Sequence, residues 1–294
     1  MTTSMTATTA TAPVAAKAKP PVPAKTGPRA TSAAAAKRTG AGLVPKIVAI
    51  VATLALWQLV AMSPLVDTDS LPTPVMVVDA LFGLWGSDAY WTALGTTLRV
   101  WATGLALSAV IGIPLGLLIG TSLRATQSTR WIIDFFRSIP TIALLPLVLL
   151  LFGATSRMEI TMIVLSAVWP LLIQSMYAAK QVEPLHKWVV RVFRISTADR
   201  LRYLWAPSVS LFVFTGLRLS ATMALLMTIS AEYIGGAPGL GLELSHMEQA
   251  FKRPEVFAYA ITAGILGLLI NAIVVAAQRR LLWWHPIIRE ERGA

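Results

Sequence analysis

The chain contains no cysteine, and charged residues make up only 13% of its 294 residues. Without cysteine it can form no disulfide, no thiolate metal site and no cysteine nucleophile. A soluble domain is usually about one-quarter charged, so the low share of charge argues against a protein that is surrounded by water. Hydrophobic residues make up 55% of the chain, which indicates a protein that is solvated by lipid.

Acidic residues are also scarce, with 14 Asp and Glu against 25 Lys and Arg. The cations lie in hydrophilic gaps between apolar runs and are not gathered on one face, so we expect no nucleic-acid partner. The sequence has no phosphate loop of the form G-x-x-x-x-G-K-[ST], no G-x-S-x-G elbow and no histidine pair with metal spacing. We therefore expect neither an enzyme nor a resident cofactor.

Long apolar runs are what the sequence does contain, and they predict an all-α, polytopic membrane protein with about six transmembrane helices. Crossing about 30 Å of hydrocarbon takes about 20 apolar residues in a helix. The six segments that qualify are residues 47–66, 98–120, 131–153, 158–178, 211–234 and 257–280.

The flanking segments differ in composition from the membrane domain, which we place at residues 46–285. Residues 1–45 contain no acidic residue and little apolar bulk, which predicts a disordered basic tail, and 286–294 form a second tail. A short apolar run with Trp85 and Trp91 precedes the second span and predicts a helix at the membrane interface.

The distribution of Lys and Arg predicts the orientation of the spans in the plasma membrane. With the N-terminus in the cytoplasm, most cations fall in cytoplasmic segments, and only Arg157, Lys252 and Arg253 lie in segments outside. The positive-inside rule therefore predicts that both termini are cytoplasmic.

A basic segment, residues 182–207, interrupts the apolar runs on the predicted cytoplasmic side. Pro184 suits the first turn of a helix, and Ser196 to Asp199 has the spacing of a capping box that would begin a second helix. This second helix would end before Pro207. Such an elbow is either a basic loop that contacts lipid phosphates or a docking helix for a soluble partner.

Polar and small residues inside the apolar segments are the other candidates. Gly104, Ser108, Gly112, Gly116 and Gly120 recur every four residues and would let another helix approach closely, either within the chain or at a moving or dimer-facing surface. Two ionisable residues of the fifth span, Arg218 and Glu232, are candidates for the lining of a pathway, although Arg218 could equally reach the interface. Asp134 and Arg137 are three residues apart and predict a local ion pair.

Four segments in order resemble the permease subunits of bacterial ABC importers, above all the branch that takes up nitrate, taurine and alkanesulfonates. Three of them, 112–120, 137–153 and 216–241, resemble spans of that family, and the fourth is the basic segment. Its frame of Glu183-Pro184, Arg191 and Pro207 matches the family's cytoplasmic signature. The signature Glu, Ala and Gly are replaced by Trp188, Val190 and Arg194.

The resemblance implies a type I (MetI-like) importer core that works as a homodimer. It implies two separate ATPase subunits that bind the ATP, a solute-binding protein outside the membrane, and import of a small solute such as nitrate, taurine or a sulfonate. Coupling to the ATPase would use Glu183, Pro184, Trp188, Val190, Arg191, Arg194, Ile195 and Pro207. Without that resemblance, a secondary transporter or a membrane scaffold stays open.

Overall fold

The computed structural model describes the chain in three long stretches and a few single positions. The described residues are 43–64, 71–180, 196, 199, 202 and 205–283. Two compact units are distinguished, Met1–Val51 and Ala52–Ala294, and the described part of the first is the beginning of α1 (Leu43–Ala61). The described residues form helices and turns without any strand, so the all-α prediction is confirmed.

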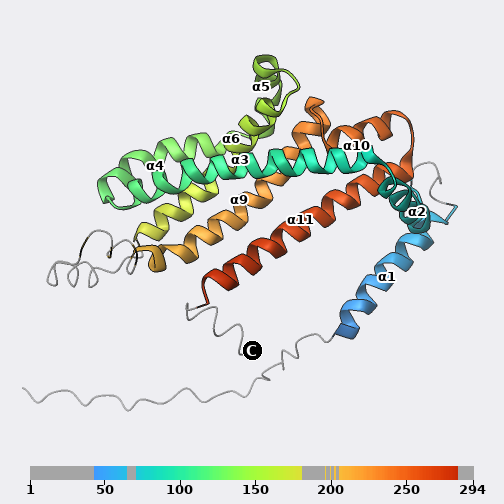
Figure 1. The fold of residues 1–294 in the computed structure, drawn as a ribbon, viewed down its shortest axis with the longest axis horizontal. Helices are drawn as coiled ribbons and strands as arrows, with labels where there is room; N and C mark the ends of the chain where they lie inside the picture. Colours follow the sequence, from blue (N-terminus) through green and yellow to red (C-terminus); the bar gives the residue numbers. More distant parts are fainter. Residues whose placement is uncertain are drawn as a thin grey trace, which may run out of the picture. The chain divides into compact units, whose positions relative to one another are not determined.

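The second unit is built from long helices joined by short ones (Figure 1). After α1 come α2 (Pro74–Trp85), α3 (Asp88–Gly120), α4 (Leu123–Ser138), η1 (Thr141–Leu144), α5 (Leu145–Phe152), α6 (Ser156–Lys180), α9 (Ala206–Gly235), α10 (Leu240–Gln249) and α11 (Arg253–Leu281). Among the described residues, five helices are long and apolar enough to cross a membrane, and a sixth crossing results if α4 and η1–α5 count as one bent span. This agrees with the predicted number.

Helix α6 packs closely against both α3 and α9, and α11 packs against α9. Apolar side chains such as Val100, Ile163 and Leu225 fill the space among these helices. Hydrogen bonds to carbonyl oxygens link α9 to both α3 and α6: the indole of Trp101 of α3 donates to Ala221 at 3.0 Å, and the hydroxyl of Ser220 donates to Ala167 of α6 at 2.6 Å. Such bonds satisfy polar groups that could not form hydrogen bonds with water inside a bilayer.

The predicted span 131–153 is not one straight helix, because the chain bends by 72° between α4 and the following helices. Figure 1 shows α5 standing at a steep angle to α4. Pro140 stands in the break, and a proline disfavours helical geometry in the residue before it. Ile139 accordingly has an extended backbone, with φ −73° and ψ 120°. The predicted span 131–153 therefore covers both arms of this bent pair, which pass as one apolar segment when taken together.

The short helix predicted before the second span is present as α2, with 12 residues. At 1.5 Å per residue it is about 18 Å long, which is too short to cross the hydrocarbon. The indole of Trp91 donates to the carbonyl oxygen of Trp85 at 2.9 Å, and both side chains are about half exposed. The position of α2 at the membrane interface stays a prediction. Helix α3 starts at Asp88, earlier than the predicted span 98–120.

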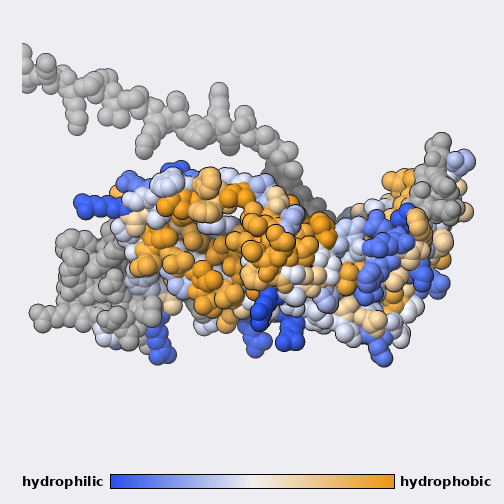
Figure 2. All heavy atoms as spheres, turned by 90° about the horizontal axis from the view of Figure 1, so that it is seen from above, coloured by the Kyte–Doolittle hydropathy of each residue, from blue (hydrophilic) through white to orange (hydrophobic). Residues whose placement is uncertain are grey.

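The outside of the described part carries many apolar side chains. Figure 2 shows a broad hydrophobic area with hydrophilic side chains at its borders. Val110 and Leu118 of α3 and Leu268 of α11 are each at least 69% exposed. Apolar area on this scale would be costly in water and is what a lipid-facing surface requires.

Candidate functional site

The small-residue stripe of α3 lies directly against the backbone of α6. A Cβ atom added to Gly116 would lie 2.3 Å from the carbonyl oxygen of Leu172, and one added to Gly120 would lie 2.5 Å from that of Met176. The two helices therefore meet backbone to backbone, which only glycine permits. All members of the stripe are buried: Gly104, Ser108, Gly112, Gly116 and Gly120. In this structure the glycines of the stripe thus pack within the chain, against α6.

Glu232 of α9 is completely buried and links three helices. One carboxylate oxygen accepts the hydroxyl of Thr97 of α3 at 2.7 Å, and the other accepts the N–H of Gly241 of α10 at 2.9 Å. Thr97 in turn accepts the N–H of Leu240 at 2.9 Å. Carboxylate and hydroxyl together cap the N-terminus of α10, where unpaired N–H groups and the helix dipole favour a negative charge. In this structure Glu232, a candidate for the lining of a pathway, holds α3, α9 and α10 together through this network.

The turn between α9 and α10 is shaped to fit this carboxylate. Gly236 ends α9 with φ 72°, a left-handed conformation that glycine adopts without strain. A Cβ atom on Gly239 would lie 2.1 Å from a carboxylate oxygen of Glu232, so the chain passes too close for a side chain. The segment between α9 and α11 is therefore largely the helix α10, held by Glu232.

Glu159, in the first turn of α6, is a buried acid that the sequence analysis missed. It is fully buried, and neither carboxylate oxygen has a hydrogen-bond partner within the part of the chain that the structure describes. An acid inside an apolar segment is a functional candidate in a membrane protein, and this signal was available in the run MEITMIVL. No comparable signal marks Thr97, because threonine is common in apolar helices.

Arg218 does not belong to the Glu232 network. Its Nε–H donates to the side-chain oxygen of Asn271 at 2.8 Å, which ties α9 to α11, and its side chain is exposed. It is not among the residues that line either of the two cavities described below. The structure therefore separates the two ionisable candidates of the fifth span.

A cavity of about 600 Å³ opens where the bend after α4 faces α6 and α9. Its wall is mostly apolar, with polar groups at a few positions. Its lining residues are Arg137, Ile139, Thr141, Ile142, Ser166, Trp169, Pro170, Ile173, Gln174, Leu219, Met223 and Met227. Mostly apolar walls with a few polar groups are the usual composition of a small-molecule site. Here Arg137 and Gln174 can donate hydrogen bonds to a small anion.

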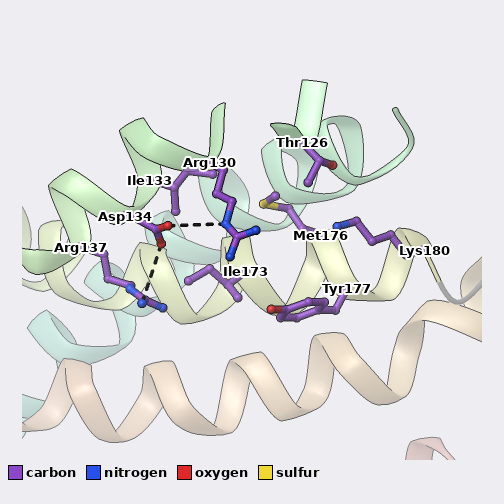
Figure 3. A pocket seen from close by; sticks show the side chains of 9 residues that line it. All are labelled: Thr126, Arg130, Ile133, Asp134, Arg137, Ile173, Met176, Tyr177 and Lys180. Carbon is purple, nitrogen blue, oxygen red and sulfur yellow. Dashed lines mark ion pairs between the residues drawn. The ribbon is translucent and has the colours of Figure 1, made fainter. Parts of the chain in front are cut away.

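The predicted ion pair between Asp134 and Arg137 is confirmed, with 3.8 Å between the charged atoms. Arg130 lies at the same distance from the same carboxylate. These residues line a second cavity, between α4 and α6 (Figure 3).

Most of the predicted coupling segment lies outside the described residues, namely Glu183, Pro184, Trp188, Val190, Arg191, Arg194 and Ile195. Ser196 and Asp199 are described, and the N–H of Asp199 donates to the hydroxyl of Ser196 at 3.1 Å. This is the main bond of the predicted capping box. Pro207 occupies the first turn of α9.

Several named permease proteins are similar in sequence to the chain over most of its length. The nitrate import permease protein NrtB of Leptolyngbya laminosa is 28% identical over 79% of this chain and 85% of its own length. The taurine transport system permease protein TauC of Escherichia coli is 27% identical over 79% of this chain and 86% of its own length.

The fold is also found in solved structures. A chain of the MetNI methionine ABC transporter in an inward-facing conformation matches with a TM-score of 0.53 and 17% identity. The match covers 70% of this chain and 96% of that one. At this identity the likeness concerns the fold, and it agrees with the expected MetI-like core.

One family model matches residues 112–282, which include the glycine-rich half of α3, the bent pair, α6, α9 and α11. The chain therefore belongs to the family of binding-protein-dependent transport system inner membrane components.

Proposed function

We propose that this chain is the permease subunit of an ATP-driven importer and that it carries a small oxyanion through the cavity between α4, α6 and α9. The observation that carries the proposal is this cavity of about 600 Å³, in a chain of an inner-membrane transport family. Among its relatives are permeases named for nitrate and taurine, and nitrate and the sulfonate group of taurine are both small oxyanions. Arginine and amide donors are suited to such groups.

The motor is a separate ATPase in this proposal, since the sequence has no phosphate loop of its own. Residues 182–207 connect α6 to α9 along the chain and include the first turn of α9, so a force on this segment would act on two walls of the cavity. We further propose that the segment and both termini are cytoplasmic, that the permease works as a homodimer, and that a binding protein delivers cargo from the other side. The distribution of Lys and Arg supports the orientation.

Reconstitution tests the assignment. The full-length chain and its ATPase, in vesicles, are expected to hydrolyse ATP faster when cargo-loaded binding protein is present and to accumulate cargo only with ATP. Uptake without ATP would indicate a secondary transporter, and neither hydrolysis nor uptake would indicate a scaffold. Trp188→Ala is expected to reduce co-purification of the ATPase, whereas Trp85→Ala, far away in sequence, is expected to retain it.

A large side chain in the cavity is expected to block the pathway. Met223 of α9 lines the cavity and is 48% exposed, while Leu226 of the same helix is 60% exposed and is not among the lining residues. We expect Met223→Trp to lower the uptake rate about tenfold, which corresponds to about 1.4 kcal/mol in the barrier. Leu226→Trp is the matched control and is expected to keep the rate. Equal rates for the two variants would place the pathway elsewhere.

A further inference from the structure

The second cavity, about 320 Å³ in volume, lies between α4 and α6 and shares only Arg137 and Ile173 with the proposed pathway. Figure 3 shows Arg130 and Arg137 on either side of Asp134, with Tyr177 and Lys180 contributed by α6. The remaining lining residues are Thr126, Ile133, Ile173 and Met176.

Positive charge is in excess around this cavity. Among the described residues, three cations line it, Arg130, Arg137 and Lys180, against the single carboxylate of Asp134. The closest atoms of each arginine lie 3.8 Å from that carboxylate, which is longer than a hydrogen bond. A guanidinium has five N–H donors, so most of them are left for another acceptor. The cavity therefore has the positive charge and the hydrogen-bond donors that an anion requires.

The floor of the cavity is apolar. Ile133 is buried and packs with Leu172 and Met176, and Ile173 lies beside them. Tyr177 is half exposed, with the amino group of Lys180 lying 5.8 Å from the centre of its ring. A cationic rim over an apolar floor suits a ligand that has both a charged head and an alkyl part.

The neighbouring surface of α4 points to lipid as the source of that ligand. Leu123, Trp131 and Phe135 of this helix are exposed by 71%, 69% and 62%. Exposed aromatic side chains next to arginines are typical of the boundary between hydrocarbon and headgroups. Basic pockets between transmembrane helices are suited to lipid headgroups.

We propose that the cavity between α4 and α6 binds the phosphate group of an anionic phospholipid, with Arg130 and Lys180 as its main contacts. The alkyl or glycerol part of the lipid lies on Ile133, Ile173 and Met176. Arg137 is held by Asp134 at the edge toward the proposed pathway, so the bound lipid would occupy the space next to the bend after α4. Binding of the lipid at this site requires neither the cargo nor the ATPase.

The test compares melting temperatures of the full-length protein, purified in mild detergent with the subunits that accompany it, as phosphatidylglycerol or phosphatidylcholine is added. We expect phosphatidylglycerol to raise the melting temperature more than phosphatidylcholine. In Arg130→Gln and in Lys180→Gln, the concentration for half of this rise is expected to increase about tenfold, which is the effect of losing one charge-assisted hydrogen bond.

Arg124→Gln is the matched control, because Arg124 is exposed on α4 but does not line the cavity. It removes the same charge from the same helix and is expected to leave the response to phosphatidylglycerol unchanged. An equal loss in Arg124→Gln and Arg130→Gln would mean general surface attraction and would overturn the proposal. Lys180→Gln tests the cavity from the other helix should Arg130→Gln fold poorly.

Inorganic phosphate, added in place of lipid, distinguishes the two sources of a phosphate group. An Arg130-dependent rise with phosphatidylglycerol alone assigns the site to a lipid headgroup. An Arg130-dependent rise with inorganic phosphate as well assigns it to any phosphate, including a soluble one. The absence of an Arg130-dependent rise with either ligand would reject the site.

Discussion

Replacing Gly116 by alanine is expected to destabilise the protein by about 1–3 kcal/mol, the usual cost of extra volume in a close-packed interior. The new Cβ would lie 2.3 Å from the carbonyl oxygen of Leu172 and 2.7 Å from the Cβ of Ser175. A backbone carbonyl group cannot move away by changing rotamer as a side chain can. The helices α3 and α6 would therefore have to separate. The measurement is the melting temperature of the purified variant, which is expected to be lower than that of the original protein.

Gly95→Ala is the control for this prediction. Gly95 lies in the same helix, and a Cβ atom there would have none of the described residues within 4 Å. Alanine is a better helix former than glycine by about 1 kcal/mol, so this variant is expected to be as stable as the original protein or more stable. Opposite signs for one substitution in one helix identify packing as the cause. A melting temperature for Gly116→Ala at or above that of the original protein would show that α3 and α6 are not in backbone contact.

Glu232→Met is expected to cause the second large loss. Methionine is similar in size, but it leaves the hydroxyl of Thr97 and the N–H of Gly241 without their acceptor in a buried place. Each unpaired buried donor costs about 1–3 kcal/mol. Besides a lower melting temperature, we expect faster hydrogen exchange at the first N–H groups of α10, since their cap is lost.

Glu159→Met is the matched control for Glu232→Met. Both acids are fully buried in long helices, but the carboxylate of Glu159 has no hydrogen-bond partner among the described residues. Replacing an unpaired buried polar group by an apolar one of similar shape is neutral or stabilising. We therefore expect an unchanged or higher melting temperature. Similar losses in both variants would show that the network with Thr97 is not what stabilises the turn.

The number of spans and the contacts between residues close in sequence could be predicted from the sequence. Span number follows from composition, because about 20 apolar residues in a row have few alternatives to a membrane helix. The Asp134–Arg137 pair and the Ser196–Asp199 cap depend on residues three apart, whose distance is set by the helix itself. The family resemblance was confirmed for the same reason, since it is carried by ordered local segments.

The contacts that build the site were not accessible in this way. Thr97 is 135 residues from Glu232, and Arg130 and Lys180 lie on different helices. Pro140 restricts the backbone of the residue before it, but the 72° bend also depends on what α5 packs against. Likewise, the basic residues of α4 suggested an ion pair and gave no sign of a cavity.

The sequence by itself determined that this is a helical membrane protein with about six apolar segments long enough to span, and to which kind of transport component it is related. Composition and short-range spacing suffice for these properties, since lipid enforces helices and helices fix the distances between near neighbours. Only the tertiary structure decided that the glycines of α3 face α6, that Glu232 caps α10, and where the two cavities lie. Each of these depends on which helix faces which, and that is set by packing between residues far apart in the chain.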